Sequence, residues 1–531
     1  MNKALVISAI FAPAVLSAAT RPNIIFLLTD DQHFNTMGCW GGDVLTPAID
    51  RLAAEGVKFT RAYTASSVSS PSRYSILSGR YSGRCSGEQF EEAFPLGTTH
   101  RIDNTTLELE DDMPNVAKLL QEAGYTTGMV GKWHIGHHFK DPRDQELRRA
   151  EWEKIGLKYY DKTADPRSEE VEEALRHNHD WYSNQIKKQG FDYADNIYWA
   201  NLKEVYSDAL NYHNIDWSVE GAIDFMDQAG DRPFFLYFST TLHHGPTPQR
   251  SLPDEYQGVT SKGFAHQEIN TLPARETLFE RLKAEGIDQK EAYTLWLDDA
   301  VGALMQYLED SGQAENTIIF YLSDHGIDQK SSMYEGGIHI PLMVWGAGVE
   351  AKGTECDRLI HTCDLTATAL EVAGVEKPAE PIMDGSSMLP LLREPHLDWR
   401  RSLYSEIGYA RCVVTDRYKY IAVRYPDPIK AKFDRGFTTE EQSKIGYIAN
   451  QGLCALGKTN PNYFAEDQLY DIKSDPMERN NLAADPNFAS TMSQMRELME
   501  CYLSKFVGRP FYDLYDGVSA TKEFNAFDAL D

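Results

Sequence analysis

The chain has 531 residues, of which 42% are hydrophobic and 25% are charged, and this composition is ordinary for a water-soluble globular protein. Such a length allows a large hydrophobic core and predicts one large domain together with a smaller one. The formal net charge of −28 argues against nucleic acids and anionic membrane surfaces as partners, because both are negatively charged themselves. Seven cysteines are present, an odd number, and their spacing matches no zinc motif.

The first 19 residues have the features of an export signal. Lys3 gives a short basic start, residues 4–16 form an apolar run, and Ser17, Ala18 and Ala19 resemble a small-residue cleavage site. The run is too short to span a bilayer permanently, and no cysteine lies near the cleavage point to carry a lipid. We therefore expect a periplasmic or secreted protein without a stable membrane anchor.

Four near-continuous apolar runs, at residues 23–28, 125–130, 233–239 and 317–322, are typical of strands buried on both faces of a parallel sheet. Helical patterns at 47–55, 113–123, 218–229 and 294–310 separate them. The alternation predicts a doubly wound α/β domain. In such sheets ligands bind beyond the carboxyl ends of the strands. The polar residues that follow the four runs are Asp30 and Asp31, Lys132 and His134, His243 and His244, and Asp324 and His325.

The remaining chain predicts two further parts. Residues 135–215 are irregular and rich in charge, which suggests an insertion or cap near the edge that carries the site. From about residue 396 the pattern changes to short strands, at 402–406, 411–415, 418–423 and 468–472, with a closing helix near 488–506. We therefore expect a catalytic domain over residues 20–395 and a small C-terminal subdomain, an antiparallel sheet plus helix, over residues 396–531.

Asp30, Asp31 and Asp324 would place three carboxylates together at this edge. Without a counter-ion they would repel one another and their pKa values would rise, so a bound cation is the expected partner. Oxygen ligands favour Ca²⁺ or Mg²⁺ over zinc, although His325 would add a nitrogen ligand and soften that preference. For one Asp pair alone, a role as a loop cap is the competing interpretation.

Residues 69–80, SSPSRYSILSGR, predict a short amphipathic helix that begins around Ser69, Ser70 and Pro71. A serine before a proline suits an N-cap, and Gly79 stands where the helix would end. A nucleophile at a helix start faces free N–H groups and the positive end of the helix dipole, which favours an anionic substrate. Arg73 and Arg80 add cations to the same element.

This segment resembles the signature of the formylglycine-dependent sulfatases, a Cys or Ser followed by x-P-S-R-x-x-x-L-x-G-R, with Ser69 at the modified position. GKWHIG at 131–136, HHGP at 243–246 and Lys330 followed by YEGG at 334–337 resemble further family segments. So do TPAIDRLAAEGVKFTRAYT at 46–64 and QLYDIKSDPMERNNLA at 468–483, and the resemblance spans nearly the whole chain. It implies an alkaline-phosphatase-like fold, a mixed doubly wound sheet flanked by helices.

The resemblance also implies a mechanism. A serine-type maturase would oxidise Ser69 to formylglycine; one hydroxyl of the hydrated aldehyde attacks sulfur, and deprotonation of the other expels sulfate. Unmodified serine would instead leave a sulfate monoester that is hard to hydrolyse. The implied ligands of a divalent cation, Ca²⁺ with Mg²⁺ as the alternative, are Asp30, Asp31, Ser69, Asp324 and His325, since related sulfatases carry either Asn or His at the last position. The implied catalytic groups are Arg73, Lys132 and Lys330 for charge on the sulfuryl oxygens, His244 as general acid and His134 as base of the elimination.

An exported sulfatase would most plausibly act on a sulfated polysaccharide or its oligosaccharides. His137, His138, Trp181, Tyr198, Trp199 and Asn201 could bind sugar rings, or could simply pack within the cap. Two alternatives stay open. The same superfamily contains phosphonate and phosphodiester hydrolases, and a chain with unmodified Ser69 would be a non-catalytic protein that binds sulfated glycans.

Overall fold

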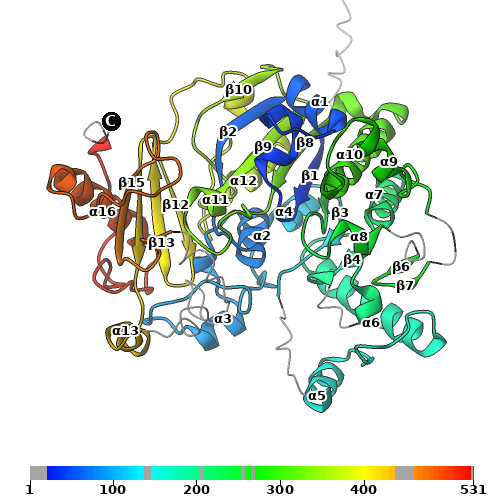
Figure 1. The fold of residues 1–531 in the computed structure, drawn as a ribbon, viewed down its shortest axis with the longest axis horizontal. Coiled ribbons are helices and arrows are strands. Elements are labelled where there is room, and N and C mark those ends of the chain that lie inside the picture. Colours follow the sequence, from blue (N-terminus) through cyan, green and yellow to red (C-terminus); the bar gives the residue numbers. More distant parts are fainter. Residues whose placement is uncertain are drawn as a thin grey trace, which may run out of the picture.

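A computed structural model describes residues 21–136, 145–202, 207–252, 258–265, 267, 269–436, 460–527 and 530. The predicted leader and residues 137 and 138 lie outside the described residues. A large α/β part and a smaller C-terminal β part lie side by side (Figure 1). The fold class predicted from the sequence is confirmed.

The large sheet has the strand order β10-β2-β9-β8-β1-β5-β3-β4, with β11 beside β2. It is mixed, because β9 runs antiparallel to its neighbours β2 and β8 whereas the other pairs are parallel. Its strands are β1 (Asn23–Thr29), β2 (Val57–Tyr63), β3 (Thr126–Lys132), β4 (Tyr193–Tyr198), β5 (Phe234–Ser239), β8 (Thr317–Ser323), β9 (His339–Gly346), β10 (Thr354–Cys356) and β11 (Ile360–His361).

Helices cover both faces of this sheet, which explains the continuous apolar runs. In β1, Ile24, Phe26 and Leu28 enter one core and Ile25 and Leu27 enter the other. The first core contains α2 (Ser69–Ser78), α4 (Val116–Glu122) and α12 (Asp364–Val372), and the second contains α1 (Pro47–Glu55), α7 (Ile215–Ala229), α9 (Thr277–Ala284) and α10 (Ala292–Asp310). Shorter elements are α3 (Glu88–Ala93), α8 (Pro248–Ser251), β6 (Val259–Thr260), β7 (Gly263–Phe264) and α11 (Glu335–Ile338).

Three helix starts differ from the sequence-based prediction: α7 begins at Ile215 rather than 218, α10 at Ala292 rather than 294, and α4 differs at its capped end. The helix expected from residue 113 begins at Val116, because the side chain of Asn115 accepts a hydrogen bond from the backbone N–H of Lys118 and caps the helix there.

The segment 135–215 is more regular than expected. It contains α5 (Gln145–Ile155) and α6 (Glu169–Lys188), and its last strand, β4, pairs with β3 at the edge of the large sheet. The later part of this segment therefore belongs to the central layer rather than to a separate cap. Asp195 and Asn196 interrupt the apolar residues of Tyr193–Tyr198, so the sequence showed no clear strand pattern here.

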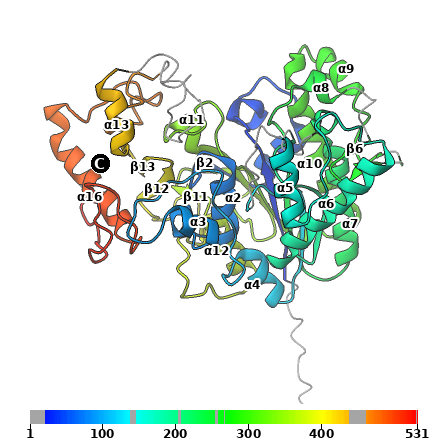
Figure 2. The same cartoon turned by 90° about the horizontal axis from the view of Figure 1, so that it is seen from below.

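The C-terminal part has an antiparallel sheet of order β12-β13-β14-β15. Its elements are β12 (Ser402–Ile407), β13 (Ala410–Thr415), β14 (Tyr418–Val423), α13 (Asp427–Asp434), β15 (Asp467–Asp471) and α16 (Ala489–Leu503). Helix α16 packs on one face, as Figure 2 also shows, while Leu403, Ile421 and Val423 of the other face join the core that contains α2. The two sheets thus share a hydrophobic core.

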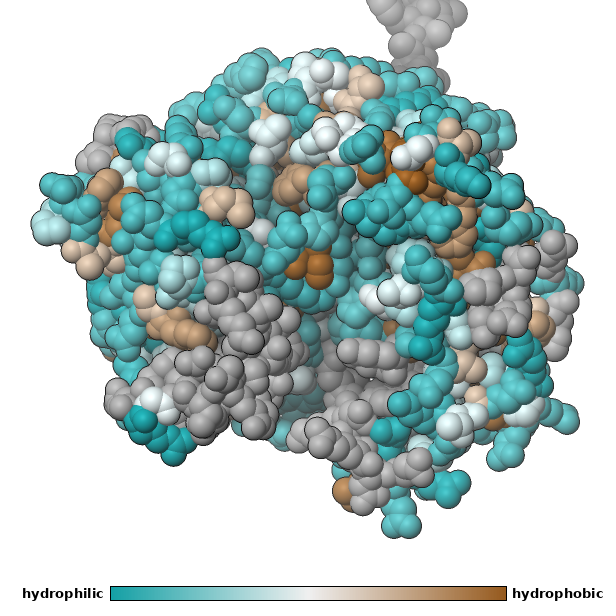
Figure 3. Space-filling view, viewed as in Figure 1, coloured by the Kyte–Doolittle hydropathy of each residue, from teal (hydrophilic) through white to brown (hydrophobic). Residues whose placement is uncertain are grey.

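The surface agrees with the acidic composition. Hydrophilic residues dominate the face shown in Figure 3, and the hydrophobic residues on it form small separate patches. Among the described residues no helix has both the length and the apolar character needed to cross a membrane. The six cysteines that the structure describes, which include Cys356 and Cys363, are all free thiols.

Candidate active site

Four neighbouring strands, in the order β8-β1-β5-β3, end at one edge of the large sheet. Asp30 and Asp31 follow β1, Asp324 and His325 follow β8, His244 follows β5, and Lys132 ends β3. Because these strands are parallel, their carboxyl ends bring together residues that are far apart in sequence. The structure therefore gathers most of the predicted catalytic and metal residues at one place.

Helix α2 brings Ser69 to this edge. All ten residues of Ser69–Ser78 are buried, so the helix is not amphipathic, and its N-cap is Val68, which provides no side-chain cap. The sequence-based prediction of a serine cap was wrong for a physical reason. The Oγ of Ser69 faces the site instead, 3.2 Å from His325 Nε2 and 3.4 Å from Asp30 Oδ1. Gly79 ends the helix in the left-handed conformation, as predicted.

Asp30, Asp31, Asp324 and His325 form a compact set of candidate metal ligands. One ligand atom from each lies within 4.8 Å of all the others, and all four residues are buried. Nδ1 of His325 lies 3.0 Å from the carbonyl oxygen of Gly326, which can only accept, so this nitrogen carries the proton. Nε2 is then the ring nitrogen that could bind a cation. Three carboxylates and one imidazole fit a hard divalent ion.

Each of the three carboxylates has its own cation. Lys132 Nζ lies 2.5 Å from Asp30 Oδ2, and Lys330 Nζ lies 2.8 Å from Asp31 Oδ1. The third pair joins Arg73 Nη2 to Asp324 Oδ2 at 3.1 Å. The sequence predicted a bound cation as the partner of the three carboxylates, and the structure shows that Lys132, Lys330 and Arg73 also supply counter-charges to them.

These ion pairs set the charge states of the site. Burial by itself would raise the pKa of Asp30, but Lys132, His244, Arg73 and Lys330 outweigh it and hold that pKa well below its usual range. Burial opposes the charge of Lys330, yet Asp31 and Asp30 keep its pKa above the ordinary value. Asp30 and Lys330 are therefore ionised near neutral pH. Burial lowers the pKa of Lys132, and the attraction of Asp30 does not fully restore it.

His244 borders the cluster, and its Nε2 lies 3.9 Å from Asp31 Oδ2. Burial lowers the pKa of His244, and the opposing attraction of Asp30 does not restore it. The sequence missed a supporting residue, the fully buried His213, whose Nε2 lies 2.7 Å from the carbonyl oxygen of His244. His243 points elsewhere, with Nε2 3.1 Å from Thr294 Oγ1, which agrees with its lower rank in the prediction.

His134 lies two residues beyond Lys132 in a left-handed conformation (φ 57°), and its backbone N–H donates to the carbonyl oxygen of Trp199. Asn201 accepts a hydrogen bond from Lys132 Nζ at 2.7 Å, so this candidate sugar contact reaches the site itself. Ser239, which the sequence did not single out, is hydrogen bonded to Arg73. No motif marked Ser239, and only its position at the end of β5 could have suggested it.

Gly131 lets β3 approach β5 just before Lys132. Its φ is +88°, and a Cβ atom there would lie 1.9 Å from the carbonyl oxygen of Ser239. We expect Gly131→Ala to lower the free energy of unfolding by at least about 2 kcal/mol, measured by urea denaturation. The matched control is Gly312→Ala, at φ +71° with no atom within 4 Å of the new Cβ, which should cost only about 1 kcal/mol. Equal losses would contradict the close approach.

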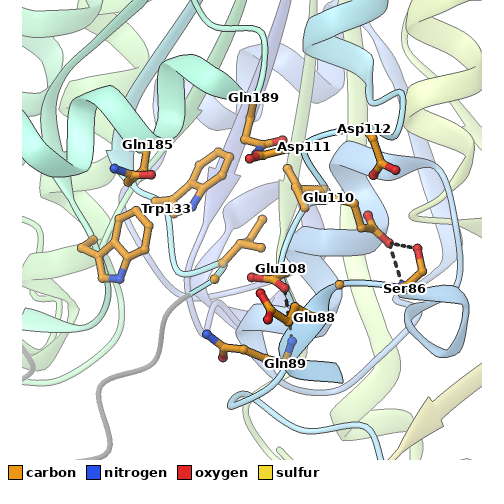
Figure 4. A pocket seen from close by; sticks show the side chains of 15 residues that line it. Ser86, Glu88, Gln89, Glu108, Glu110, Asp111, Asp112, Trp133, Gln185 and Gln189 are labelled. Carbon is orange, nitrogen blue, oxygen red and sulfur yellow. Dashed lines mark hydrogen bonds between the residues drawn. The ribbon is translucent and has the colours of Figure 1, made fainter. Parts of the chain in front are cut away.

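A cavity of about 380 Å³ lies beside the chain that leaves β3. Trp133, Ile135 and Trp199 line it together with acidic and amide side chains, which Figure 4 shows around the opening. The acidic members are Glu88, Glu108, Glu110, Asp111 and Asp112. Trp199 also stacks on Tyr182, with ring centroids 4.8 Å apart, and Tyr198 is buried. Trp199 and Tyr198, two of the candidate sugar contacts, therefore pack within the fold.

A mixed sheet whose polar groups gather where parallel strands end places a ligand site at this edge, as in the alkaline-phosphatase-like hydrolases. The chain belongs to the sulfatase family and is a sulfuric ester hydrolase, since the family model described as Sulfatase matches residues 22–165 and 174–375. A second model, N-sulphoglucosamine sulphohydrolase, C-terminal, matches residues 323–441.

The chain is 25% identical to the N-acetylglucosamine-6-O-sulfatase of Bacteroides thetaiotaomicron, over 90% of this chain and 86% of that protein. Its fold is similar to that of a protein solved with its substrate D-glucosamine-2-N,6-O-disulfate, with a TM-score of 0.56, 20% identity and coverage of 92% and 98% of the two chains. It is also similar to the phosphonate monoester hydrolase of Agrobacterium radiobacter, with a TM-score of 0.58, 16% identity and coverage of 92% and 96%. Enzymes for different esters thus share this fold.

Proposed function

We propose that this protein is an exported sulfatase that hydrolyses sulfate esters of a polysaccharide or its oligosaccharides, using formylglycine made from Ser69 and a divalent cation. The observation that carries the proposal is the position of Ser69 Oγ, 3.2 Å from His325 Nε2 and 3.4 Å from Asp30 Oδ1. The nucleophilic position of the family signature thus lies against the candidate metal ligands. A sugar substrate agrees with the name of the Bacteroides relative.

The local charge balance explains how so acidic a protein could bind an anion. Three carboxylates and three cations pair within the site, so it is close to neutral despite the net charge of −28. A divalent cation and a sulfate ester would then enter as charges of opposite sign that largely compensate each other. Burial of the ion pairs strengthens this compensation, because water screens them little.

When bound, the cation polarises the sulfate ester and formylglycine at position 69 supplies a hydroxyl nucleophile through its hydrated aldehyde. The residues of the chain orient the reaction. Lys132, Lys330 and Arg73 provide donors for charge that develops on the sulfuryl oxygens. His244 is the proposed general acid, since a bound anion favours its protonated form, and His134 is the proposed base.

The function is tested on protein made with its own signal and a serine-type maturase. Peptide mass of the fragment that contains Ser69 should show the loss of two hydrogens, and a carbonyl reagent should label that residue. The same preparation should release sulfate from at least one member of a sulfated-saccharide panel. A protein that is neither labelled nor active would instead favour the alternative of a non-catalytic protein that binds sulfated glycans. Export is tested by the location of the mature chain and by its N-terminal sequence.

A phosphonate or phosphodiester hydrolase is the second candidate, and the likeness in fold to the phosphonate monoester hydrolase favours it specifically. The two functions are separated by ranking kcat/KM on aryl sulfate, phenylphosphonate monoester and phosphate diester substrates. Sulfate should rank first, because Lys132, His134, His244 and Lys330 together match the segments of the sulfatase family. All three substrates carry a single negative charge, so charge alone does not separate them.

His244→Ala should discriminate between leaving groups. A sugar alcohol is a poor leaving group that needs a proton, whereas a nitrophenolate leaves without one. We expect kcat/KM to fall about 10²-fold or more on a sugar sulfate and less than about tenfold on 4-nitrophenyl sulfate. The control His243→Ala removes the neighbouring imidazole, which faces Thr294, and should leave the ratio of the two activities unchanged. A similar loss on both substrates would refute the role of His244 as an acid.

A further inference from the structure

The C-terminal segment 468–483, QLYDIKSDPMERNNLA, resembles a segment of the family, yet the proposed mechanism uses none of its residues. Its central residue, Glu478, is fully buried and has a left-handed backbone with φ 52°. Such a conformation is unfavourable for a residue with a side chain, so the surroundings must hold it in place. The backbone N–H of Glu478 donates to the carbonyl oxygen of Asp475, which closes the turn.

Glu478 forms a buried triad with Lys419 of β14 and Glu335 of α11, in which burial raises the pKa of Glu478 to about 7. Lys419 Nζ lies 2.5 Å from Glu335 Oε1 and 2.9 Å from Glu478 Oε1. Lys419 and Glu478 are fully buried, so water does not weaken these contacts. Although burial opposes the charge of Lys419, the two carboxylates hold its pKa above the ordinary value.

The triad fixes the backbone as well as the side chain of Glu335. The backbone N–H of Glu335 donates to Glu478 Oε2 at 2.6 Å. On the other side, Tyr63 OH donates to Glu335 Oε2 at 3.1 Å. Glu335 is therefore held from β2 of the large sheet and from the C-terminal subdomain at the same time.

The chain next to Glu335 carries Lys330, and several bonds close it into a compact loop over residues 326–337. Gly336 donates to Gln329 Oε1 at 2.9 Å, and Gln329 N–H donates back to the carbonyl oxygen of Gly336 at 3.1 Å. Gly326, the residue after His325, donates to the carbonyl oxygen of Gly337 at 3.0 Å. A shift of Glu335 would thus move the base of the loop from which Lys330 reaches Asp31.

We propose that Lys419 and Glu478 are positioning residues, through which the C-terminal subdomain holds the loop 326–337 so that Lys330 meets Asp31. Neither residue touches the reacting groups, and they act through Glu335. The inference rests on the proposed catalytic role of Lys330, but it adds a task for the C-terminal subdomain and for the 468–483 segment. The site is then complete only when both parts of the chain are packed together.

A double-mutant cycle tests the proposal with 4-nitrophenyl sulfate as the probe. Lys419→Met should lower kcat about tenfold in the otherwise unchanged enzyme, and less than about twofold in a Lys330→Ala background. Glu478→Gln keeps the size of the side chain and an acceptor for the backbone N–H of Glu335. It should show the same pattern with a smaller loss of kcat, and it replaces Lys419→Met if that variant folds poorly. Activities are expressed per formylglycine, counted by peptide mass.

A merely structural role predicts a different result, because lost stability would lower activity equally in both backgrounds. Equal losses of kcat with and without Lys330, or no loss in the otherwise unchanged enzyme, would overturn the proposal. The matched control is Arg424→Met, which removes a nearly buried cation at the end of the same sheet that pairs with Asp467 and Asp513. It should lower the melting temperature and change kcat less than about twofold. If Lys330→Ala alone left kcat unchanged, the proposed catalytic role of Lys330 would fail. This outcome differs from equal losses in the two backgrounds, which would overturn only the positioning role of Lys419 and Glu478.

Discussion

Ser69→Ala is expected to abolish sulfate-ester hydrolysis, with kcat at least about 10⁴-fold lower than that of the parent enzyme. Alanine has no oxygen to be oxidised, so neither the aldehyde nor its hydrate can form. The fold should survive, because the Oγ of Ser69 lies within hydrogen-bond distance of the site residues His325 and Asp30 and caps no helix. Melting temperature should therefore change little, and a carbonyl reagent should no longer label the protein.

The control for this prediction is Ser75→Ala in the same buried helix. Ser75 Oγ lies 3.3 Å from Ser82 Oγ and faces away from the site, so activity and labelling should persist. A further variant, Ser69→Cys, should be active only when it is made with a maturase that oxidises cysteine. Substantial turnover by Ser69→Ala would show that another group attacks sulfur, and would remove formylglycine from the mechanism.

The parallel core of the fold could be predicted because its signal is local. A strand buried on both faces must be apolar throughout, and the runs that became β1, β3, β5 and β8 satisfy this condition. The residues after each run then had to meet at one edge, since parallel neighbours end together. Asp30, Asp31, Asp324, His325, Lys132 and His244 were therefore placed in one site without any knowledge of distances.

The errors arose where structure depends on long-range partners. Helix α2 looked amphipathic because it contains five serines and an arginine, yet it is buried on every side between the large sheet and the C-terminal subdomain. Strand β4 looked like part of a cap because Asp195 and Asn196 interrupt its apolar residues. Strand β9 was not predicted, and nothing local to His339–Gly346 reveals that it inserts antiparallel between β8 and β2.

The electrostatics of the site were the least predictable feature. Lys132 is 102 residues from Asp30, and Lys330 is 299 residues from Asp31, so only the folded chain shows which cation meets which carboxylate. The sequence predicted three carboxylates together with the cations Lys132, Lys330 and Arg73 at this edge, but not which of them would pair. The structure shows three ion pairs, and this changes what a metal would do. In the proposed mechanism a bound metal would polarise the ester, and neutralising the carboxylates would not depend on it alone.

Asp30→Asn is expected to remove the bound metal and most of the activity, because Asp30 is a proposed ligand and lies against Ser69. The metal content, measured by mass spectrometry, should fall below a tenth of the parent value. The kcat should fall at least about 10³-fold. The fold should also weaken, since Lys132 is fully buried and would lose its carboxylate partner at 2.5 Å. Breaking one half of a buried ion pair costs about 3 kcal/mol of unfolding free energy.

Asp298→Asn separates these effects, because it changes an equally buried aspartate that does not face the site. Asp298 accepts hydrogen bonds from the backbone N–H groups of Ala48 and Ile49 at the start of α1. Its substitution should lower stability and leave the metal content and the activity per formylglycine intact. In the parent enzyme, chelation should abolish turnover and added Ca²⁺ or Mg²⁺ should restore it, the more effective ion being the native one. If Asp30→Asn kept its metal and only lost stability, Asp30 would be a partner of Lys132 alone, and the ligands of the cation would have to be sought among Asp31, Asp324 and His325.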